Sequence, residues 1–131
     1  MERSSARLWR KIRARYNLVG NECQSCKSEY FPPRPICKKC GKKTEMAVKK
    51  FAGNGEVYSF TKIRVPPDTF REEAPYYVGV IKLEEGPMVE GHILDDGREI
   101  KIGTKVRAAF RRMYVEGDEG LIHYQFKFEP I

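Results

Sequence analysis

Four cysteines, arranged as two C-x-x-C pairs, constrain this chain more than any other feature of its sequence. Cys23 and Cys26 form the first pair, and Cys37 and Cys40 follow after ten intervening residues. The N-terminal residues are charged throughout and lack the apolar run of a secretory signal, so we expect a cytoplasmic protein. No stretch is apolar enough to span a membrane. In a reducing compartment, paired cysteines are more often metal ligands than disulfides.

Four thiolates around one ion are typical of a closed tetrahedral zinc site. Such a site has no open position for water or substrate, which disfavours hydrolytic zinc and indicates a structural role. Iron in a rubredoxin-like electron carrier would use the same ligands and remains the alternative. Gly41 follows the second pair and can supply a positive φ for the turn there. Lys27 stands at the matching place after the first pair, where the same conformation would be strained.

The formal charge of +7 divides unequally along the chain. Residues 1–50 hold 14 Lys and Arg against 4 Asp and Glu, a balance of +10, whereas residues 51–131 hold 11 against 14, a balance of −3. Residues 3–17 lack Pro and Gly and predict a helix that Ser4 or Ser5 could cap. Its apolar stripe is narrow, with Leu8 and Ile12 on one line and Trp9 beside them. We expect this stripe to contact a partner; loose packing on its own domain is the alternative.

From residue 51 onward the hydrophobic pattern has a period of two, which predicts strands. The predicted strands are 55–65, 76–83, 88–94, 105–115 and 121–128, with a short run at 99–102 after a tight turn at Asp96-Gly97. In the last strand, Ile122, Tyr124, Phe126 and Phe128 share one face, and His123, Gln125 and Lys127 share the other. Five or six short strands without an intervening helix favour a small closed or partly open barrel.

The segments NLVGNECQSCKSEYFPPRPICKKCG, GNGEVYSFTKI, APYYVGVIKLEEG and IKIGTKV, in this order, resemble the DUF35 family. The resemblance covers nearly the whole chain and departs from the family at Lys27, where glycine is usual. It implies a mainly β protein with an N-terminal helix (1–18), a rubredoxin-like zinc ribbon (19–46) and an OB-fold barrel (47–131). It also implies one structural Zn²⁺, bound by the four cysteines.

The family is associated with acyl-CoA enzymes. The length and basic helix look most like the archaeal members that bridge acetoacetyl-CoA thiolase and HMG-CoA synthase in the mevalonate route to isoprenoids. The resemblance therefore implies a non-catalytic scaffold in a multienzyme complex, which could also contact coenzyme A where the enzymes meet. We expect the helix to dock through Leu8, Trp9 and Ile12. The loop between the cysteine pairs would dock through Tyr30, Phe31 and Arg34, although this loop could instead pack on its own barrel.

Two other functional classes compete with the scaffold. An enzyme is disfavoured because His92 and His123 lie in separate strands, without a nucleophile beside them. Single-stranded nucleic-acid binding is the stronger alternative, because Phe110, Arg111, Arg112 and Tyr114 combine aromatic and basic side chains as OB-fold binding grooves do. The net negative charge of residues 51–131 argues against it.

Overall fold

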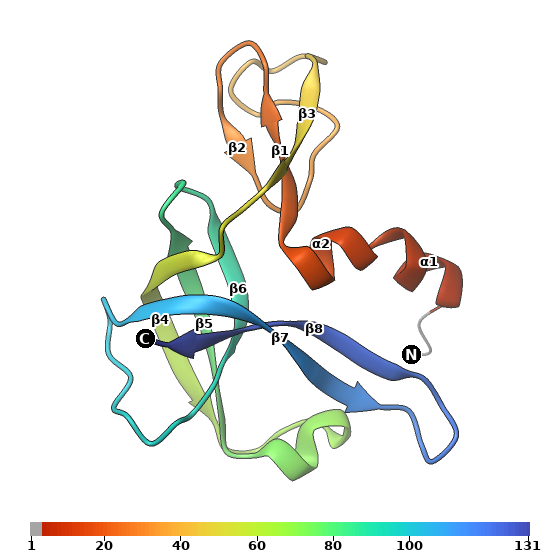
Figure 1. Cartoon of the computed structure of the whole chain (residues 1–131), viewed down its shortest axis with the longest axis vertical. Helices are drawn as coiled ribbons and strands as arrows, with labels where there is room; N and C mark the ends of the chain where they lie inside the picture. The colour runs from red at the N-terminus through yellow and green to blue at the C-terminus, as the bar shows by residue number, and fades with distance from the viewer. Residues whose placement is uncertain (1–3) are drawn as a thin grey trace. The chain divides into compact units, whose positions relative to one another are not determined.

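The computed structural model describes residues 4–131, which divide into two compact units, one within Met1–Ala52 and one at Gly53–Ile131. The first unit contains helices α1 (Ser5–Arg10) and α2 (Ile12–Asn17) and strands β1 (Val19–Cys23), β2 (Glu29–Tyr30) and β3 (Met46–Lys50). The second contains β4 (Asn54–Ile63), the 3₁₀ helix η1 (Asp68–Glu73), β5 (Tyr76–Leu83), β6 (Met88–Ile93), β7 (Lys105–Val115) and β8 (Ile122–Pro130) (Figure 1). No helix among the described residues is long and apolar enough to cross a membrane.

The single helix predicted for residues 3–17 is wrong in detail, and its first residue lies outside the described residues. The chain forms two short helices that are separated at Lys11, where φ is −102° and ψ is 3°. Basic residues stand three or four positions apart throughout this segment (Arg7, Arg10, Lys11, Arg13, Arg15), and neither helix has an acidic residue in its first turn. Like charges at these spacings destabilise a continuous helix. Ser4 takes the N-cap position, but its side chain makes no capping hydrogen bond.

The first unit is built on a three-stranded antiparallel sheet in the order β2-β1-β3. Leu18, with a left-handed φ of 52°, turns the chain from α2 into β1, and its carbonyl accepts the backbone N–H of Phe51 at 3.1 Å. Both side chains are 2% exposed and, together with Cys23 and Cys37, are the buried hydrophobic residues of this unit's described part. Strand β3 pairs with β1 from Met46 to Lys50, so this strand belongs to the ribbon, whereas the predicted boundary after residue 46 assigns most of it to the barrel.

The second unit is a closed barrel of five strands in the order β4-β5-β6-β8-β7, as expected for an OB-fold. Its strands match the five long predicted ones to within two or three residues. The alternation along each strand fills the barrel with side chains that are almost completely buried, namely Val57, Ile81, Leu83, Val89, Val106 and Phe128. Gly91 is required on β6, because a Cβ there would lie 2.9 Å from the Phe128 ring.

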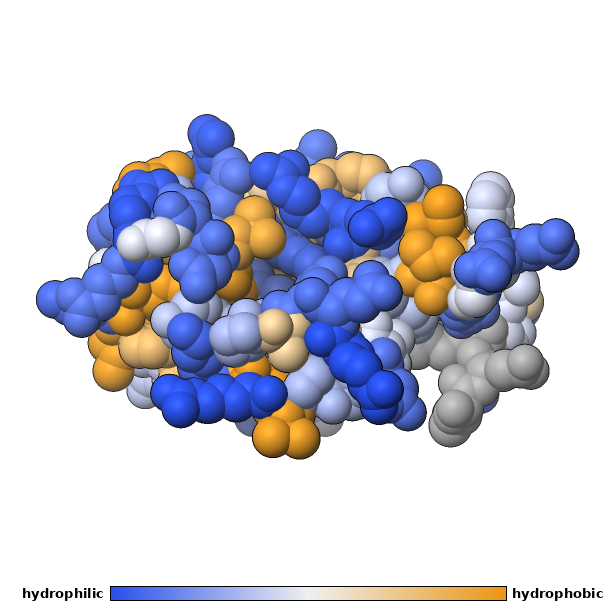
Figure 2. Space-filling model, turned by 90° about the horizontal axis from the view of Figure 1, so that it is seen from below, coloured by the Kyte–Doolittle hydropathy of each residue, from blue (hydrophilic) through white to orange (hydrophobic). Residues whose placement is uncertain are grey.

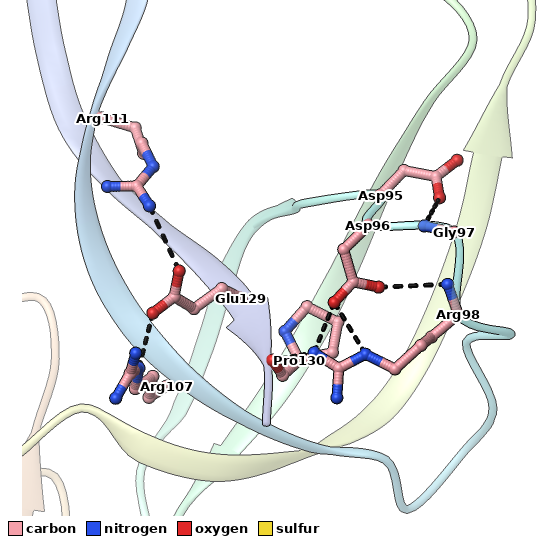
Figure 3. A network of polar contacts seen from close by, with 8 residues as sticks. All are labelled: Asp95, Asp96, Gly97, Arg98, Arg107, Arg111, Glu129 and Pro130. Carbon is pink, nitrogen blue, oxygen red and sulfur yellow. Dashed lines mark hydrogen bonds and ion pairs between the residues drawn. The ribbon is translucent and has the colours of Figure 1, made fainter.

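The predicted short strand at 99–102 and its tight hairpin are wrong. In the loop from Leu94 to Thr104, the Asp95 and Asp96 carboxylates accept backbone N–H groups two residues ahead, at 3.1 Å each, so the aspartates stabilise turns rather than a hairpin. Arg98 donates to Asp96 and to the Pro130 carbonyl, which fastens this loop to the end of β8 (Figure 3). Ile100, in the same loop, is buried.

The β7–β8 hairpin extends beyond the other strands (Figure 1). Strand β4 pairs only with the first residues of β7, from Lys105 to Arg107, and β6 pairs with β8 at Ile93 and Phe128. From there to the turn, β7 and β8 pair with each other alone, through Val115 and Ile122. The apolar face of β8 therefore continues past the barrel that buries its other half.

Candidate metal centre

The four cysteines of the ribbon come together as the sequence predicts. Cys23 ends β1 and Cys26 lies in the turn after it, while Cys37 and Cys40 flank the second turn. Their four sulfur atoms all lie within 4.8 Å of one another. Cys23 and Cys37 are buried, and Cys26 lies at the surface.

Each C-x-x-C pair forms a tight turn closed by a backbone hydrogen bond. The N–H of Lys27 donates to the Cys23 carbonyl at 2.9 Å, and the N–H of Gly41 donates to the Cys37 carbonyl at 3.0 Å. Lys27 has a φ of 60° and Gly41 a φ of 66°, so Lys27 does adopt the conformation that glycine would take more easily. The two pairs therefore present their sulfurs in equivalent local geometry.

The donor set fits a tetrahedral ion. Sulfurs bound to zinc at about 2.3 Å stand about 3.8 Å apart at the corners of a tetrahedron. The Sγ atoms of Cys23 and Cys40 are 3.9 Å apart, and those of Cys26 and Cys37 are 3.4 Å apart. Four thiolates leave no position open for water or substrate, so this arrangement can hold an ion but cannot activate a ligand on it.

The protonation of the cluster shows why it needs a cation. The hydroxyl of Thr44 hydrogen-bonds the Cys23 sulfur at 3.2 Å and is the main reason that the pKa of Cys23 falls to about 6. The neighbouring sulfurs of Cys26 and Cys37 raise the pKa of Cys40 to about 12. Four thiols this close cannot all ionise unless a positive charge lies between them.

Tyr30 belongs to the surroundings of this cluster. Its hydroxyl lies 3.3 Å from the Cys37 sulfur and accepts the backbone N–H of Lys38 at 3.1 Å. The hydrogen bond to the tyrosine hydroxyl is the main reason that the pKa of Cys37 is lowered. Arg34 lies over the Tyr30 ring, 5.7 Å from its centroid. The structure therefore brings together two of the three predicted docking residues of the loop, and Phe31 lies beside them in the chain, half-buried.

Asn21, which sequence analysis did not single out, fastens that loop to β1. Its side chain is buried, donates to the Arg34 carbonyl at 2.6 Å and accepts the Arg34 N–H at 3.2 Å. Sequence analysis did not single out Thr44 either. A single polar residue in a polar stretch does not show which distant atom its side chain will hydrogen-bond. The one hint was position, because Asn21 stands two residues before Cys23 and shares its face of the strand.

The three predicted docking residues of the N-terminal segment do not lie on one continuous helix. Leu8 lies on α1 and Ile12 on α2, both half-buried, and the break at Lys11 interrupts their common line. Trp9 is 76% exposed. Their predicted role in docking stays a prediction.

The two histidines lie on strands of the barrel, His92 on β6 and His123 on β8. His92 stacks on Tyr76 with ring centroids 4.8 Å apart, and burial is the main cause of its lowered pKa. His123 was predicted on the polar face; it lies there but is buried, bonded to Glu116 at 2.8 Å and stacked on Tyr114. Neither histidine has a Ser or Cys beside it among the contacts of the described residues.

Comparison with known proteins agrees with this architecture. The family model "ChsH2, rubredoxin-like zinc ribbon domain" matches residues 10–46, and "ChsH2, C-terminal OB-fold domain" matches residues 48–111. Together with the cluster of four cysteines, the first match supports one structural zinc per chain. The ribbon would hold this ion with the thiolates of Cys23, Cys26, Cys37 and Cys40.

Relatives match over most of the chain. A "DUF35 domain-containing scaffold protein" of Methanocaldococcus jannaschii is 44% identical over 95% of this chain and 89% of its own length. A "Probable enoyl-CoA hydratase alpha subunit" of Thermomonospora curvata is 36% identical over 75% of this chain, which corresponds to 30% of that protein. A solved structure, "Ltp2-ChsH2(DUF35) aldolase", is 28% identical with a TM-score of 0.69, over 99% of this chain and 96% of the matched chain. These matches support an acyl-CoA-associated scaffold subunit, and the chain belongs to the DUF35 family.

Proposed function

We propose that this chain is a non-catalytic scaffold that holds acetoacetyl-CoA thiolase and HMG-CoA synthase together in the cytoplasm. The scaffold names of relatives that match its full length support the general role. The two enzymes are our inference from the length and the basic helix, which resemble the archaeal members. On this chain itself, the observation that carries the proposal is a continuous apolar face of the β7–β8 hairpin that the barrel leaves exposed.

That face follows directly from the sequence pattern. Phe126 and Phe128 on β8 are buried in the barrel, while Tyr124 and Ile122, which continue the same alternation, are 37% and 48% exposed. Phe110 on β7 is 51% exposed and stacks on Tyr124, with ring centroids 5.2 Å apart. The alternation along β8 predicts an apolar face that is buried over the whole strand, but the barrel covers only about half of that face. Exposed apolar faces of this kind, rich in aromatic residues, mark protein interaction sites.

The other unit carries the docking residues that the sequence predicts. Trp9 projects from a segment rich in Arg and Lys, and Tyr30, Phe31 and Arg34 lie at the loop between the cysteine pairs. Figure 2 shows one face of the molecule, where hydrophobic residues form separate patches among hydrophilic ones. Tryptophan, tyrosine and arginine are the residue types that most often carry interface binding energy. A basic unit with an exposed Trp9 and an acidic barrel unit with an apolar hairpin face suit two different partner enzymes.

A scaffold has a chemical reason to join these two enzymes. Condensation of two acetyl-CoA molecules by a thiolase is unfavourable, and the next condensation draws it forward. Holding the enzymes together raises the effective concentration of an intermediate that never accumulates. On this proposal the chain holds the two enzymes next to each other, and the enzymes catalyse both reactions.

Single-stranded nucleic-acid binding is the competing function, favoured by the stacked pair of Phe110 and Tyr124 and by the two arginines that follow Phe110 on β7. The charges weaken this alternative. Glu129 pairs with both Arg107 and Arg111, so two of the cations on this strand are already neutralised (Figure 3). A mobility-shift titration with random single strands distinguishes the two: tight binding that falls steeply with salt supports nucleic acid.

Capture of the two enzymes by surface variants tests the proposal. Tagged wild-type protein is compared with Trp9→Ala, with Phe110→Ser/Tyr124→Ser and with Tyr58→Ser, a control at a barrel aromatic that is 56% exposed elsewhere. Loss of an interface hot spot costs about 2 kcal/mol or more. We expect each surface variant to lose at least one enzyme while its melting temperature and zinc content stay unchanged, and the control to retain both. Retention of both enzymes by every variant would show that these surfaces do not dock them.

A further inference from the structure

The segment that joins β4 to β5 folds back over the outer surface of the barrel. We call residues 66–75, which contain η1, the strap. The side chains of Phe70 and Glu73 contact the barrel. The ring of Phe70 lies 4.9 Å from the ring of His92 on β6, and 5.7 Å from the rings of Tyr76 and Tyr114. Glu73 makes the second contact, with Lys127.

Lys127 is buried where its position predicts exposure. It stands on β8 between Phe126 and Phe128, whose side chains fill the barrel, so its own side chain points outward. Nevertheless Lys127 is only 5% exposed. Its ammonium group lies 3.2 and 3.1 Å from the two carboxylate oxygens of Glu73. A lysine is almost never buried without a counter-charge, and here the strap supplies it.

The walls around Phe70 are aromatic. Tyr76 and His92 are stacked with an angle of 8° between their planes, and Tyr114 stacks on His123 with centroids 4.2 Å apart. Burial lowers the pKa of His92, which agrees with surroundings that hold little water. Beneath the strap, therefore, aromatic rings from three strands surround Phe70. After burial, the charge of the Lys127 ammonium group is the next cause that lowers the pKa of His92, so this cation lies near the same rings.

This is the face on which OB-folds bind ligands. Such folds bind on the outer surface of their second and third strands, between the loop that joins strands one and two and the loop that joins strands four and five. In this barrel those strands are β5 and β6, and the strap is the first of those loops. The second loop follows Tyr114 and precedes His123. The usual ligand position is thus occupied by a ring and a carboxylate of the chain itself.

We propose that the surface beneath the strap is a binding site for a nucleoside phosphate, with Phe70 in the place of the base and Glu73 in the place of the phosphate. Aromatic side chains stack on bases of any sequence, and a lysine ammonium pairs with phosphate as it does with a carboxylate. One aromatic position and one cation match one base and one phosphate. The ligand enters when the strap, which Phe70 and Glu73 hold down, moves away. This site does not depend on the scaffold function proposed above.

The test is a titration of the full-length, zinc-loaded protein with AMP, followed by calorimetry and by NMR of the His92 ring. The open variant is Phe70→Ala/Glu73→Gln. The matched control is Thr69→Ala/Glu72→Gln, which changes two exposed residues of the same strap. We expect the open variant to bind AMP at least ten-fold more tightly than wild type and control. Adding Lys127→Gln to the open variant should weaken binding at least ten-fold, and adenosine and ribose 5-phosphate should each bind at least ten-fold more weakly than AMP.

Equal AMP affinity in the open variant and the control would overturn the proposal, as would equal binding of AMP and adenosine. Because Glu73→Gln leaves Lys127 without its counter-charge, the open variant could lose its fold, which the NMR spectrum of the barrel reports. In that case Phe70→Ala alone is compared with Thr69→Ala. Tighter AMP binding with a shifted His92 ring in Phe70→Ala supports the site, and its absence refutes it.

Discussion

Replacing Tyr30 with phenylalanine should weaken zinc binding without disturbing the ribbon. The change removes one hydroxyl and keeps the ring on which Arg34 lies. That hydroxyl lies 3.3 Å from the Cys37 sulfur and accepts the N–H of Lys38 at 3.1 Å. A hydrogen bond to a charged group contributes about 1.5–3 kcal/mol. In the variant, the exposed backbone N–H of Lys38 can hydrogen-bond to water in place of the tyrosine hydroxyl, so its loss adds little. We therefore expect a loss of about 2 kcal/mol, or roughly 30-fold in zinc affinity, within the range of about 10- to 100-fold that is usual for such supporting residues.

The assay is competition for zinc with a chromophoric chelator at neutral pH, on wild type, Tyr30→Phe and Tyr58→Phe. Tyr58 is an exposed tyrosine of the barrel, so its hydroxyl serves as the control. Unchanged affinity in Tyr30→Phe would refute the reasoning, because the hydroxyl would then contribute nothing to the thiolate. An equal loss in both variants would contradict it as well, since the effect would not be local to the cluster.

Three further predictions concern the metal, the chemistry and the barrel. Elemental analysis should find one zinc per chain, and Cys37→Ser should unfold the ribbon and reduce the soluble yield. Iron with a reversible reduction wave, in protein purified from its native source, would contradict a structural zinc. The isolated protein should turn over neither acetoacetyl-CoA nor HMG-CoA, and robust thiolysis by the protein alone, after rigorous removal of contaminating enzymes, would contradict this. Folding lowers the pKa of His92, mainly through burial. Below the ordinary histidine pKa of about 6.5, the unfolded chain therefore binds a proton at His92 more readily than the folded chain, and acid destabilises the fold. The melting temperature of the barrel should therefore fall from pH 7 to pH 5, and a slope that is the same in His92→Asn would show that another group is responsible.

The sequence predicted most of what depends on repeating patterns. The alternation that begins at Gly55 located all five barrel strands, and the spacing of the cysteines located the metal cluster. Both signals are local: a strand shows its buried face every second residue, and a C-x-x-C pair forms its own turn. Even the strain at Lys27 could be anticipated, because it occupies the place that Gly41 takes in the second pair.

The remaining features depend on contacts between distant residues. Lys127 and His123 belong to a face that the pattern marks as polar, and both are buried because other parts of the chain, Glu73 and Glu116, reach them. Conversely, Ile122 and Tyr124 belong to an apolar face, and both are exposed because β8 extends beyond the other strands of the barrel. Periodicity shows which side of a strand a residue faces, but it does not show what lies on that side.

The helix shows a different limit. Residues 3–17 contain neither Pro nor Gly, so propensity favours one continuous helix, whereas the chain divides at Lys11. Repulsion among the basic residues opposes continuity, and little packing compensates, because Ser5–Arg10 contains no buried residue. In a short helix without buried residues, packing adds little to helix propensity, so propensity alone does not determine where the helix ends.

The most direct test of the scaffold function is the mass of the species that forms when the three purified proteins are mixed. Light scattering after size-exclusion chromatography is performed on thiolase and synthase with and without this chain at equal concentrations. The proposal predicts one species containing all three proteins with the chain present, and separate enzymes without it. If the two enzymes associate equally well without the chain, or if neither binds it, the chain is not their scaffold.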